Sequence, residues 1–236
     1  MKKYKLTTET LQFAGRTLHR IKAVKDFDSI KAGEFGGWIE NEKNLSQDDN
    51  AWIYGDAMVF DNAEVYDNAK VYGNANVSGN ANVSGNANVF GNANVFGNAN
   101  VFGNAKVYGN ANVFGYAEVY DNAKVYGNAN VSGNAEVSGN AEVSDYAKVY
   151  GNAAIKGDAK VHDAVDYIVF KNFWSSGRYF TWTSSNNKWS VGCFYGTGEE
   201  LIKKAYADSE KSGREYERVV RYVESILADE KKEKSN

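Results

Sequence analysis

Two histidines, His19 and His162, are the chain's candidates for acid–base chemistry. An imidazole titrates near neutral pH, so either side chain could act as a general base towards a bound substrate. His162 is the better candidate, because it lies beside the C-terminal segment, which could complete a site around it. A solvent-facing side chain is nevertheless the simpler interpretation of His162, and we favour it.

Cys193 is the sole cysteine, which excludes an internal disulfide framework. A cysteine nucleophile needs a neighbouring base or an activated thiolate, and the sequence around Cys193 holds no histidine. We therefore interpret Cys193 as a small packed thiol. Scattered aspartates, among them Asp56, Asp61, Asp67 and Asp121, lack the spacing of a calcium loop and are interpreted as turn formers. No metal site is predicted.

These side chains must be positioned by a six-residue repeat that runs without interruption through residues 51–164. The repeat occurs nineteen times, most often as Gly-Asn-Ala-Asn-Val followed by Ser, Phe or Tyr. Alanine recurs from Ala51 to Ala159, and Val or Ile follows two places later, from Ile53 to Val161. Because side chains alternate along a strand, each Ala and its Val share one side, and the Gly-Asn pair forms a corner. Stacked copies would bury Val on Val and Ala on Ala.

This small-x-aliphatic-x-x-x pattern resembles the hexapeptide repeat of left-handed parallel β-helices. The resemblance implies three hexads per turn, and hence about 6.3 turns for nineteen hexads. The predicted fold is mainly β, with three parts. They are an N-terminal cap with irregular first rungs (1–50), a left-handed parallel β-helix (51–164) and a small C-terminal α+β module (165–236).

The N-terminal part is predicted to open with two short strands, residues 4–7 and 17–24, around a turn at Ala14-Gly15. Irregular first rungs are predicted at Val24, Ile30, Ile39 and Leu45, with Phe35 and Trp38 covering the end of the stack. This region also resembles proteins of bacteria and prophages, some of them labelled transferases on fold alone. The resemblance lies in Gly36-Gly37-Trp38-Ile39-Glu40, Asn44-Leu45-Ser46 and Trp52-Ile53-Tyr54.

Many hexapeptide-repeat proteins are acyltransferases. The resemblance therefore implies a trimer, an acyl-CoA cleft between subunits, a loop that projects from the helix and a histidine base. This sequence departs from that pattern, because no insertion interrupts residues 51–164 and its only two histidines, His19 and His162, each lie near an end. Carbonic anhydrases of this fold use three histidines for zinc, and two cannot supply that set.

If three hexads make one turn, residues eighteen apart stack on one face. The first face then carries a column of aromatic side chains with lysines beside it. This face is a predicted subunit or partner contact, or a stacking surface for bases or sugars. A third interpretation is that stacked aromatic rings only stabilise neighbouring rungs. The residues are Tyr54, Tyr72, Phe90, Tyr108 and Tyr126, beside Lys70, Lys106 and Lys124.

Residues 165–236 are predicted to form three strands and two helices, a βββαα module. The strands are 165–173, 178–183 and 188–195. Thr197-Gly198-Glu199-Glu200 is a capping-box pattern that begins a helix to about Ser209. Ser212-Gly213 is predicted to break the chain before a second helix, 214–230.

The C-terminal module adds two groups of candidate binding residues. The second helix carries a basic stripe, Lys211, Arg214, Arg218 and Arg221, which neighbouring glutamates could neutralise as local ion pairs. The predicted sheet is rich in aromatic residues, and Trp182 is the candidate for a binding surface on it.

The net charge of −3 and the absence of a strongly basic segment argue against general nucleic-acid binding. The sequence shows neither a leader nor a long apolar run, so no membrane interaction is predicted and a cytoplasmic location is expected.

Our leading hypothesis is a non-enzymatic binding or structural protein. By resemblance it is associated with phages or prophages. In that case it would act in the host cytoplasm and could block a host protein. The expected partner is another protein or a second copy, in a dimer or trimer, with no cofactor. The alternative is an acyl-CoA-dependent acyltransferase with a site between subunits.

Overall fold

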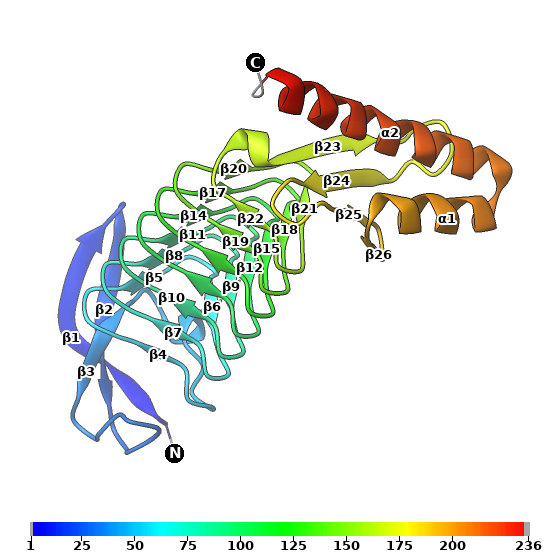
Figure 1. The fold of residues 1–236 in the computed structure, drawn as a ribbon. Helices are drawn as coiled ribbons and strands as arrows, with labels where there is room; N and C mark the ends of the chain where they lie inside the picture. The colour runs from blue at the N-terminus through cyan, green and yellow to red at the C-terminus, as the bar shows by residue number, and fades with distance from the viewer. Residues whose placement is uncertain (1, 234–236) are drawn as a thin grey trace. The chain divides into compact units, whose positions relative to one another are not determined.

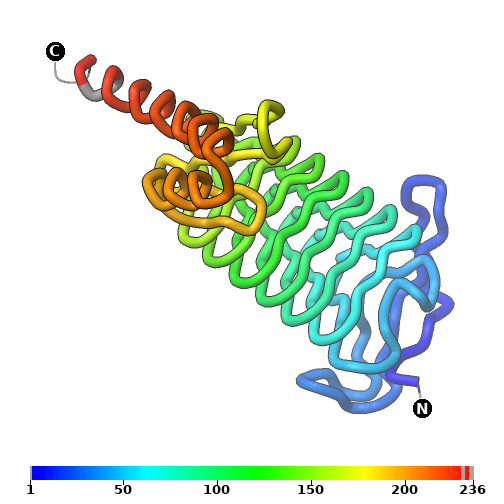
Figure 2. The backbone as a smooth tube through the Cα atoms, turned by 90° about the vertical axis from the view of Figure 1, so that its right-hand side faces the viewer, coloured from blue at the N-terminus to red at the C-terminus, as the bar shows by residue number. Residues whose placement is uncertain are grey.

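A computed structural model describes residues 2–233 and divides into two compact units, Met1–Ala164 and Val165–Asn236 (Figure 1). The first unit contains an N-terminal antiparallel hairpin and the repeat region. Figure 2 shows the repeat region as a regular series of coils. The second unit contains a four-stranded sheet and two helices. No helix among the described residues is long and apolar enough to cross a membrane.

The first unit begins with strands β1 (Tyr4–Phe13) and β2 (Arg16–Ala23), an antiparallel hairpin around the turn at Ala14-Gly15. Strand β2 pairs antiparallel with β3 (Phe35–Ile39), and β3 pairs in parallel with repeat strand β5 (Met58–Val59). The hairpin therefore extends one sheet of the β-helix beyond its first repeat strand. It covers the unpaired edge that the first rung of a solenoid would otherwise expose.

The irregular first rungs lie only partly where the sequence predicts them. Ile39 pairs with Val59, and Leu45 forms a parallel bridge to Val65, so these two are rungs. Val24 is exposed, and Ile30 bridges back to Phe27 within the loop before β3, so the prediction of rungs at Val24 and Ile30 is wrong. The short 3-10 helix Glu42–Asn44 precedes Leu45.

The repeat forms nineteen two-residue strands, β4 to β22, arranged in three parallel columns. Their bounds are β4 Trp52–Ile53, β5 Met58–Val59, β6 Glu64–Val65, β7 Lys70–Val71, β8 Asn76–Val77, β9 Asn82–Val83, β10 Asn88–Val89, β11 Asn94–Val95, β12 Asn100–Val101, β13 Lys106–Val107, β14 Asn112–Val113, β15 Glu118–Val119, β16 Lys124–Val125, β17 Asn130–Val131, β18 Glu136–Val137, β19 Glu142–Val143, β20 Lys148–Val149, β21 Ala154–Ile155 and β22 Lys160–Val161.

The strands stack in a register of eighteen residues. Asn88 pairs with Lys106, and Val89 with Val107, so three hexads complete each turn. The Phe90 amide donates to the Val107 carbonyl at 2.9 Å, and equivalent bonds repeat along the helix. The Ala and Val side chains of the repeat are buried on the inner side. The predicted parallel β-helix with three hexads per turn is confirmed.

Corners are made by glycine or aspartate in the left-handed backbone region. Gly97, for example, has φ of 76°, and a Cβ on it would lie 3.0 Å from the backbone nitrogen of Gly115 in the next rung. Asp61 occupies an equivalent corner with φ of 61°, and its carboxylate accepts a bond from the Gly79 amide at 3.1 Å. Asp67 and Asp121 do the same, so the interpretation of these aspartates as turn formers is correct.

Asparagine amides form ladders that run from rung to rung along the corners. In each ladder, the side-chain NH₂ of one asparagine donates to the side-chain oxygen of the asparagine eighteen residues later. Such ladders add polar cross-rung bonds to the stacked backbone. The longest, called here the Asn50 ladder, contains Asn50, Asn68, Asn86, Asn104, Asn122 and Asn140.

The second unit begins within the 3-10 helix Ala164–Asp166 and continues with an antiparallel sheet. Its strands are β23 (Tyr167–Lys171), β24 (Tyr179–Thr183), β25 (Lys188–Val191) and β26 (Phe194–Gly196). Four strands replace the three predicted, because Gly192, with φ of 57°, turns the chain inside the predicted strand 188–195. The sheet packs on helices α1 (Gly198–Asp208) and α2 (Glu210–Glu233) through a core that contains Phe180, Trp189 and Val220.

Helix α1 (Gly198–Asp208) begins at the predicted capping box. The Thr197 side chain accepts from the Glu200 amide, and the Glu200 carboxylate accepts from the Thr197 amide. Helix α2 (Glu210–Glu233) begins directly after Ser209, so the predicted break at Ser212-Gly213 is wrong. Gly213 lies inside α2, where a Cβ would be 2.2 Å from the ring of Tyr206. This glycine allows close packing of the two helices.

Candidate functional site

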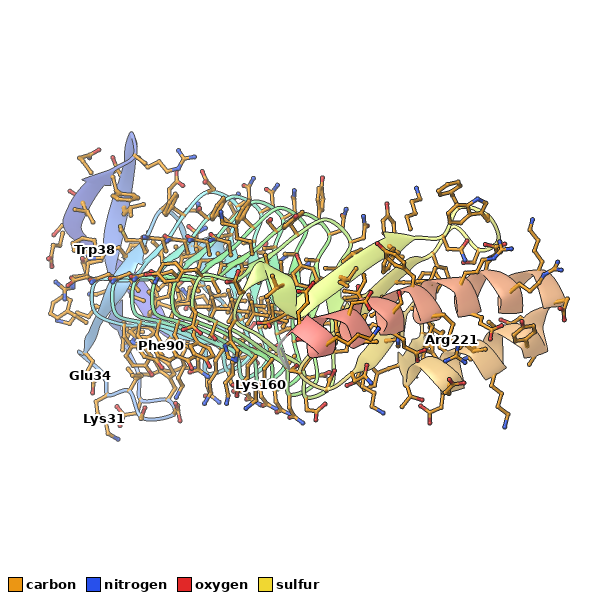
Figure 3. All side chains as sticks on the ribbon, turned by 45° about the horizontal axis from the view of Figure 1, so that its top comes forward. Lys31, Glu34, Trp38, Phe90, Lys160 and Arg221 are labelled. Atoms are coloured by element: carbon orange, nitrogen blue, oxygen red, sulfur yellow. The ribbon has the colours of Figure 1, made fainter. Side chains whose placement is uncertain are left out.

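The first face is the outer surface of the seven-stranded sheet β4-β7-β10-β13-β16-β19-β22. The aromatic column on it consists of Tyr54, Tyr72, Phe90, Tyr108 and Tyr126, each on successive turns (Figure 3 labels Phe90). From Tyr72 to Tyr126 the rings are parallel, with centroids 4.7 to 5.0 Å apart. This spacing is that of neighbouring strands, so the rungs place the rings in stacking contact.

Stacking changes what the aromatic column can bind. Each ring within the column stacks face to face on the rings before and after it. The column therefore exposes only ring edges and tyrosine hydroxyls to a ligand. A base or sugar cannot insert between these rings without separating rungs. Tyr54 differs, because it meets Tyr72 edge-on at an interplanar angle of 85°. The stacking from Tyr72 to Tyr126 is the geometry that the rung-stabilising interpretation expects, and similar stacks such as Phe96–Phe114 occur on other faces.

The lysines beside the aromatic column have different surroundings. Lys70 pairs with Asp28 at 3.0 Å, and this bond raises the pKa of Lys70 and lowers that of Asp28. Lys124 pairs with Glu142 at 2.9 Å, which raises the pKa of Lys124 and lowers that of Glu142. Lys106 lies between them, is exposed and makes no ion pair within residues 2–233. Lys106 is therefore a cation near the middle of the first face that has no carboxylate partner among the described residues.

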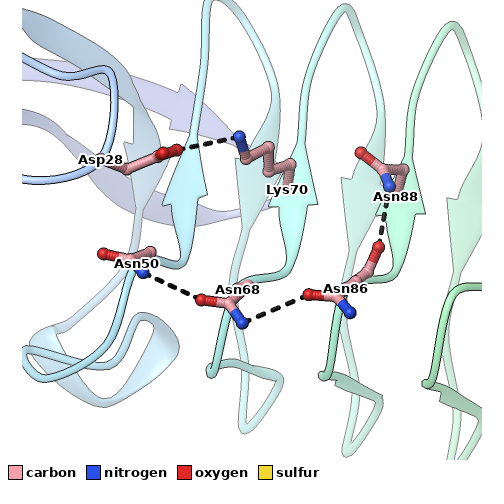
Figure 4. A pocket seen from close by; sticks show the side chains of 6 residues that line it. All are labelled: Asp28, Asn50, Asn68, Lys70, Asn86 and Asn88. Carbon is pink, nitrogen blue, oxygen red and sulfur yellow. Dashed lines mark hydrogen bonds and ion pairs between the residues drawn. The ribbon is translucent and has the colours of Figure 1, made fainter.

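Two hollows adjoin on this face at its N-terminal end. The first has a volume of about 300 Å³ and lies between Lys70 and the Asn50 ladder (Figure 4). The Lys70–Asp28 pair borders it, and the Asn88 amide donates to the Asn86 carbonyl at 2.9 Å. The second, about 380 Å³, is lined by Tyr54, Lys70, Tyr72 and Asn88. Lys70 and Asn88 belong to both hollows.

The first hollow offers hydrogen bonds, and the second offers aromatic surface. The lining residues that the sequence analysis missed are Asp28, Asn50, Asn68, Asn86 and Asn88. The eighteen-residue spacing of Asn50, Asn68 and Asn86 is a sequence signal that could have placed these three beside the first face. Asn88 lies eighteen residues after Lys70 and pairs with it. Asp28 has no such signal, because it reaches Lys70 from the loop before β3.

His162 lies on the first face at the last repeat strand and is about half exposed. Its Nδ1 atom lies 2.6 Å from the Ser144 hydroxyl and 3.2 Å from an Asp145 carboxylate oxygen. In a serine triad the hydroxyl and the carboxylate contact different ring nitrogens. Here both contact Nδ1, so the three residues do not form a nucleophilic triad. The contacts do fix the orientation of the imidazole.

The other sequence candidates lie in the second unit. Trp182 is buried in the core and donates to Asn187, so its predicted place on a binding surface is wrong. Arg218 pairs with Glu215, and Arg221 pairs with glutamates on both helices (Figure 3 labels Arg221). Two of the four members of the basic stripe are therefore neutralised. Lys211 and Arg214 are exposed and make no ion pair among the described residues.

Cys193 is exposed, so its interpretation as a packed thiol is wrong. The cause is the turn between β25 and β26, which the sequence analysis treated as part of one strand. In the described part of the chain, no group of three or more His, Cys, Asp or Glu side chains could hold a metal ion.

Comparison with known proteins gives a partial match. No family model matches the chain. It is 39% identical over 62 residues to "Uncharacterized acetyltransferase YdcK" of Escherichia coli strain K12. The alignment covers 23% of this chain and 19% of that protein, so the chain spans about a fifth of the length of the curated relative it matches. Together with the six-residue repeat and the eighteen-residue pairing register, this match supports identification of residues 51–164 as a hexapeptide-repeat β-helix.

Proposed function

We propose that the chain is a non-enzymatic binding protein whose β-helix holds the first face rigid for contact with a protein partner. The observation that carries the proposal is the combination of the aromatic column with Lys106, the exposed lysine that lacks a carboxylate partner among the described residues. Tyrosine edges and hydroxyls held by stacking lose little side-chain freedom on binding, which favours affinity.

The chemistry of the first face indicates the kind of partner. A partner should place a carboxylate near Lys106 and apolar or aromatic groups against the edges of Tyr72, Phe90 and Tyr108. The resemblance to prophage proteins makes a host protein the first class of partner to test. A second copy of the chain is a different outcome of the same test.

The experiment uses the full chain and matched variants. Lys106→Gln and Tyr108→Ser remove one charge and one member of the aromatic column. Lys5→Gln and Phe114→Ser are the controls in the nine-stranded sheet. Lys5 is an exposed lysine of β1 with no ion pair among the described residues, and Phe114 stacks on Phe96 at 4.9 Å. Partners captured by the wild type are identified, and their Kd values are measured for each variant. We expect the first pair to raise Kd about fivefold or more, and the second pair to leave it unchanged.

Two results would contradict the proposal. One is an equal loss of binding in Phe114→Ser, which would mean that the effect is structural. The other is unchanged binding in both Lys106→Gln and Tyr108→Ser. Light scattering across protein concentrations identifies self-association, and the same variants then test whether the contact uses the first face.

Acetyl transfer is the second candidate function, and two observations favour it. One is the similarity to the protein named as an acetyltransferase. The other is the orientation of His162 by Ser144 and Asp145, since a carboxylate on Nδ1 commonly orients a histidine base. Acetyl-CoA would be the acyl donor.

This candidate makes a separate prediction. Acetyl-CoA at about 100 times its Kd should stabilise the folded chain by about 2.7 kcal/mol, seen as a rise in Tm. His162→Gln should retain that stabilisation while losing release of CoA in the presence of an acceptor. No rise in Tm at saturating acetyl-CoA would contradict acetyl transfer and leave the binding proposal in place.

A further inference from the structure

The second unit contains a cavity that the proposed function does not use. It has a volume of about 230 Å³ and lies between the β25–β26 turn and helix α1. Pockets for drug-sized ligands span about 300 to 1,000 Å³, so this one suits a smaller molecule. Part of its wall is apolar, formed by the core residues Val191, Leu201 and Ala205.

Charged side chains surround this apolar wall. Arg178, which precedes β24, lies against the β25–β26 turn, since its Cδ is 3.6 Å from the position of a Cβ on Gly192. Lys204 projects from α1 and lies over the Phe194 ring, 5.8 Å from its centroid. Asp208 lies at the end of the same helix, and all three charged residues line the cavity.

The charges at this cavity are uncompensated within the described residues. Arg178, Lys204 and Asp208 make no ion pair there, although Lys204 and Asp208 are four residues apart on one helix. Elsewhere in the unit, Arg218 and Arg221 are paired with glutamates. The cavity therefore combines two cations and one anion with an apolar wall, and none of the three charges has an ion-pair partner among the described residues.

We propose that this cavity binds a small apolar carboxylate, best matched by an apolar α-amino acid. Arg178 and Lys204 would bind the carboxylate, because a guanidinium forms paired bonds to a carboxylate and an ammonium adds a point charge. The apolar side chain would cover Val191 and Leu201. Asp208 would accept from the α-ammonium group. The C-terminal residue of a polypeptide supplies the same carboxylate and apolar group, without the ammonium.

Cys193 provides a direct readout, because it lines the cavity, is exposed and is the chain's sole cysteine. The rate of its alkylation by iodoacetamide is measured on the full chain with and without leucine. A ligand at about ten times its Kd leaves about one site in eleven free, so we expect labelling to be about tenfold slower. Leucinamide, which lacks the carboxylate, should give no protection.

Variants test the assigned contacts through the ratio of labelling rates with and without ligand. Arg178→Gln should weaken leucine binding about tenfold or more, the usual loss for a hydrogen bond between charged groups. Arg214→Gln is the matched control, because Arg214 is an exposed arginine of the same unit that does not line the cavity. Circular dichroism confirms that both variants are folded.

The two sources of carboxylate are distinguished with N-acetyl-leucine and a short peptide ending in leucine. Protection by leucine alone supports a free amino acid held at both ends. Equal protection by all three supports a polypeptide C-terminus as the ligand. Three results would overturn the proposal: equal protection by leucine and leucinamide, full protection retained in Arg178→Gln, or no protection by any carboxylate probe up to its solubility limit. None of these results bears on the first face.

Discussion

The two units are stabilised in different ways. The β-helix buries small side chains, Ala and Val, and each inner strand pairs with the strands one turn before and one turn after it. The C-terminal unit buries large ones, including Phe180, Trp189 and Tyr216, in one cluster between a sheet and two helices. A solenoid distributes its stability over many equivalent contacts, whereas a small module depends on a few large residues. The same kind of substitution should therefore have different effects in the two units.

The largest effect is expected from Trp189→Ala in the second unit. Trp189 is buried and packs edge-on against Phe180, with ring centroids 6.4 Å apart. Removal of a buried aromatic side chain costs about 3–5 kcal/mol, which approaches the whole stability of a small module. Limited proteolysis should remove residues 165–236 from the variant and leave the β-helix resistant. Resistance equal to the wild type throughout would show that the two units do not differ in this way.

A smaller effect is expected at a corner of the β-helix. Gly97→Ala places a Cβ against Gly115 at a positive φ, which should cost about 1–3 kcal/mol in the free energy of unfolding. Gly97→Asp should cost less. Asp61, Asp67 and Asp121 adopt the same backbone geometry, and each carboxylate accepts a hydrogen bond from the backbone amide eighteen residues later, in the next rung. Urea unfolding followed by circular dichroism measures both. An equal loss in the two variants would exclude this compensating role for the carboxylate.

The N-terminal cap should make the first unit sensitive to pH. Burial lowers the pKa of Lys3 to about 8, although its ammonium donates to three backbone carbonyls. Because the pKa of Lys3 is lower in the folded chain, the folded chain binds fewer protons than the unfolded chain. The free energy of unfolding should therefore rise with pH between about 8 and 10.5, the pKa of lysine in the unfolded chain. Burial raises the pKa of Tyr4, which removes stability as the pH rises above about 10. The free energy of unfolding of the wild type should be higher at pH 9 than at pH 7. In Lys3→Met this increase should be absent.

The smallest effect is expected from the Asn50 ladder. Asn104→Ala removes one bond from Asn86 and one to Asn122, and should cost about 1 kcal/mol because the ladder is exposed. Asn134 is the matched control, since it occupies an equivalent exposed corner and makes no ladder bond within the described residues. Asn134→Ala should therefore leave the urea midpoint unchanged. Equal midpoints for the two variants would mean that the ladder does not stabilise the helix.

The sequence predicts the β-helix closely because one period determines both burial and register. Ala51 and Ile53 already show which side faces inward, and the spacing of eighteen places Tyr72 beside Phe90. The capping box at Thr197 and Glu200 is equally local and was also predicted. Local patterns of this kind need no knowledge of distant contacts.

Features that depend on distant contacts were missed. Gly213 reads as a helix breaker, but it lies inside α2 because Tyr206 packs against it. Trp182 is predicted on a binding surface, but the pairing register of β24 and β25 places its side chain in the core. Asp28 reaches Lys70 across forty-two residues of sequence, so no local pattern places it at the first hollow.

The pairing register limits how the length of this chain can change through duplication or loss of sequence. Adding or removing eighteen residues inserts or deletes one whole turn and leaves every downstream side chain on its face. A change of six residues preserves the repeat and the buried valines, yet it moves Tyr108 and Lys106 to a different face. Sequence variants that differ by eighteen residues should therefore keep the same surface, and variants that differ by six should not.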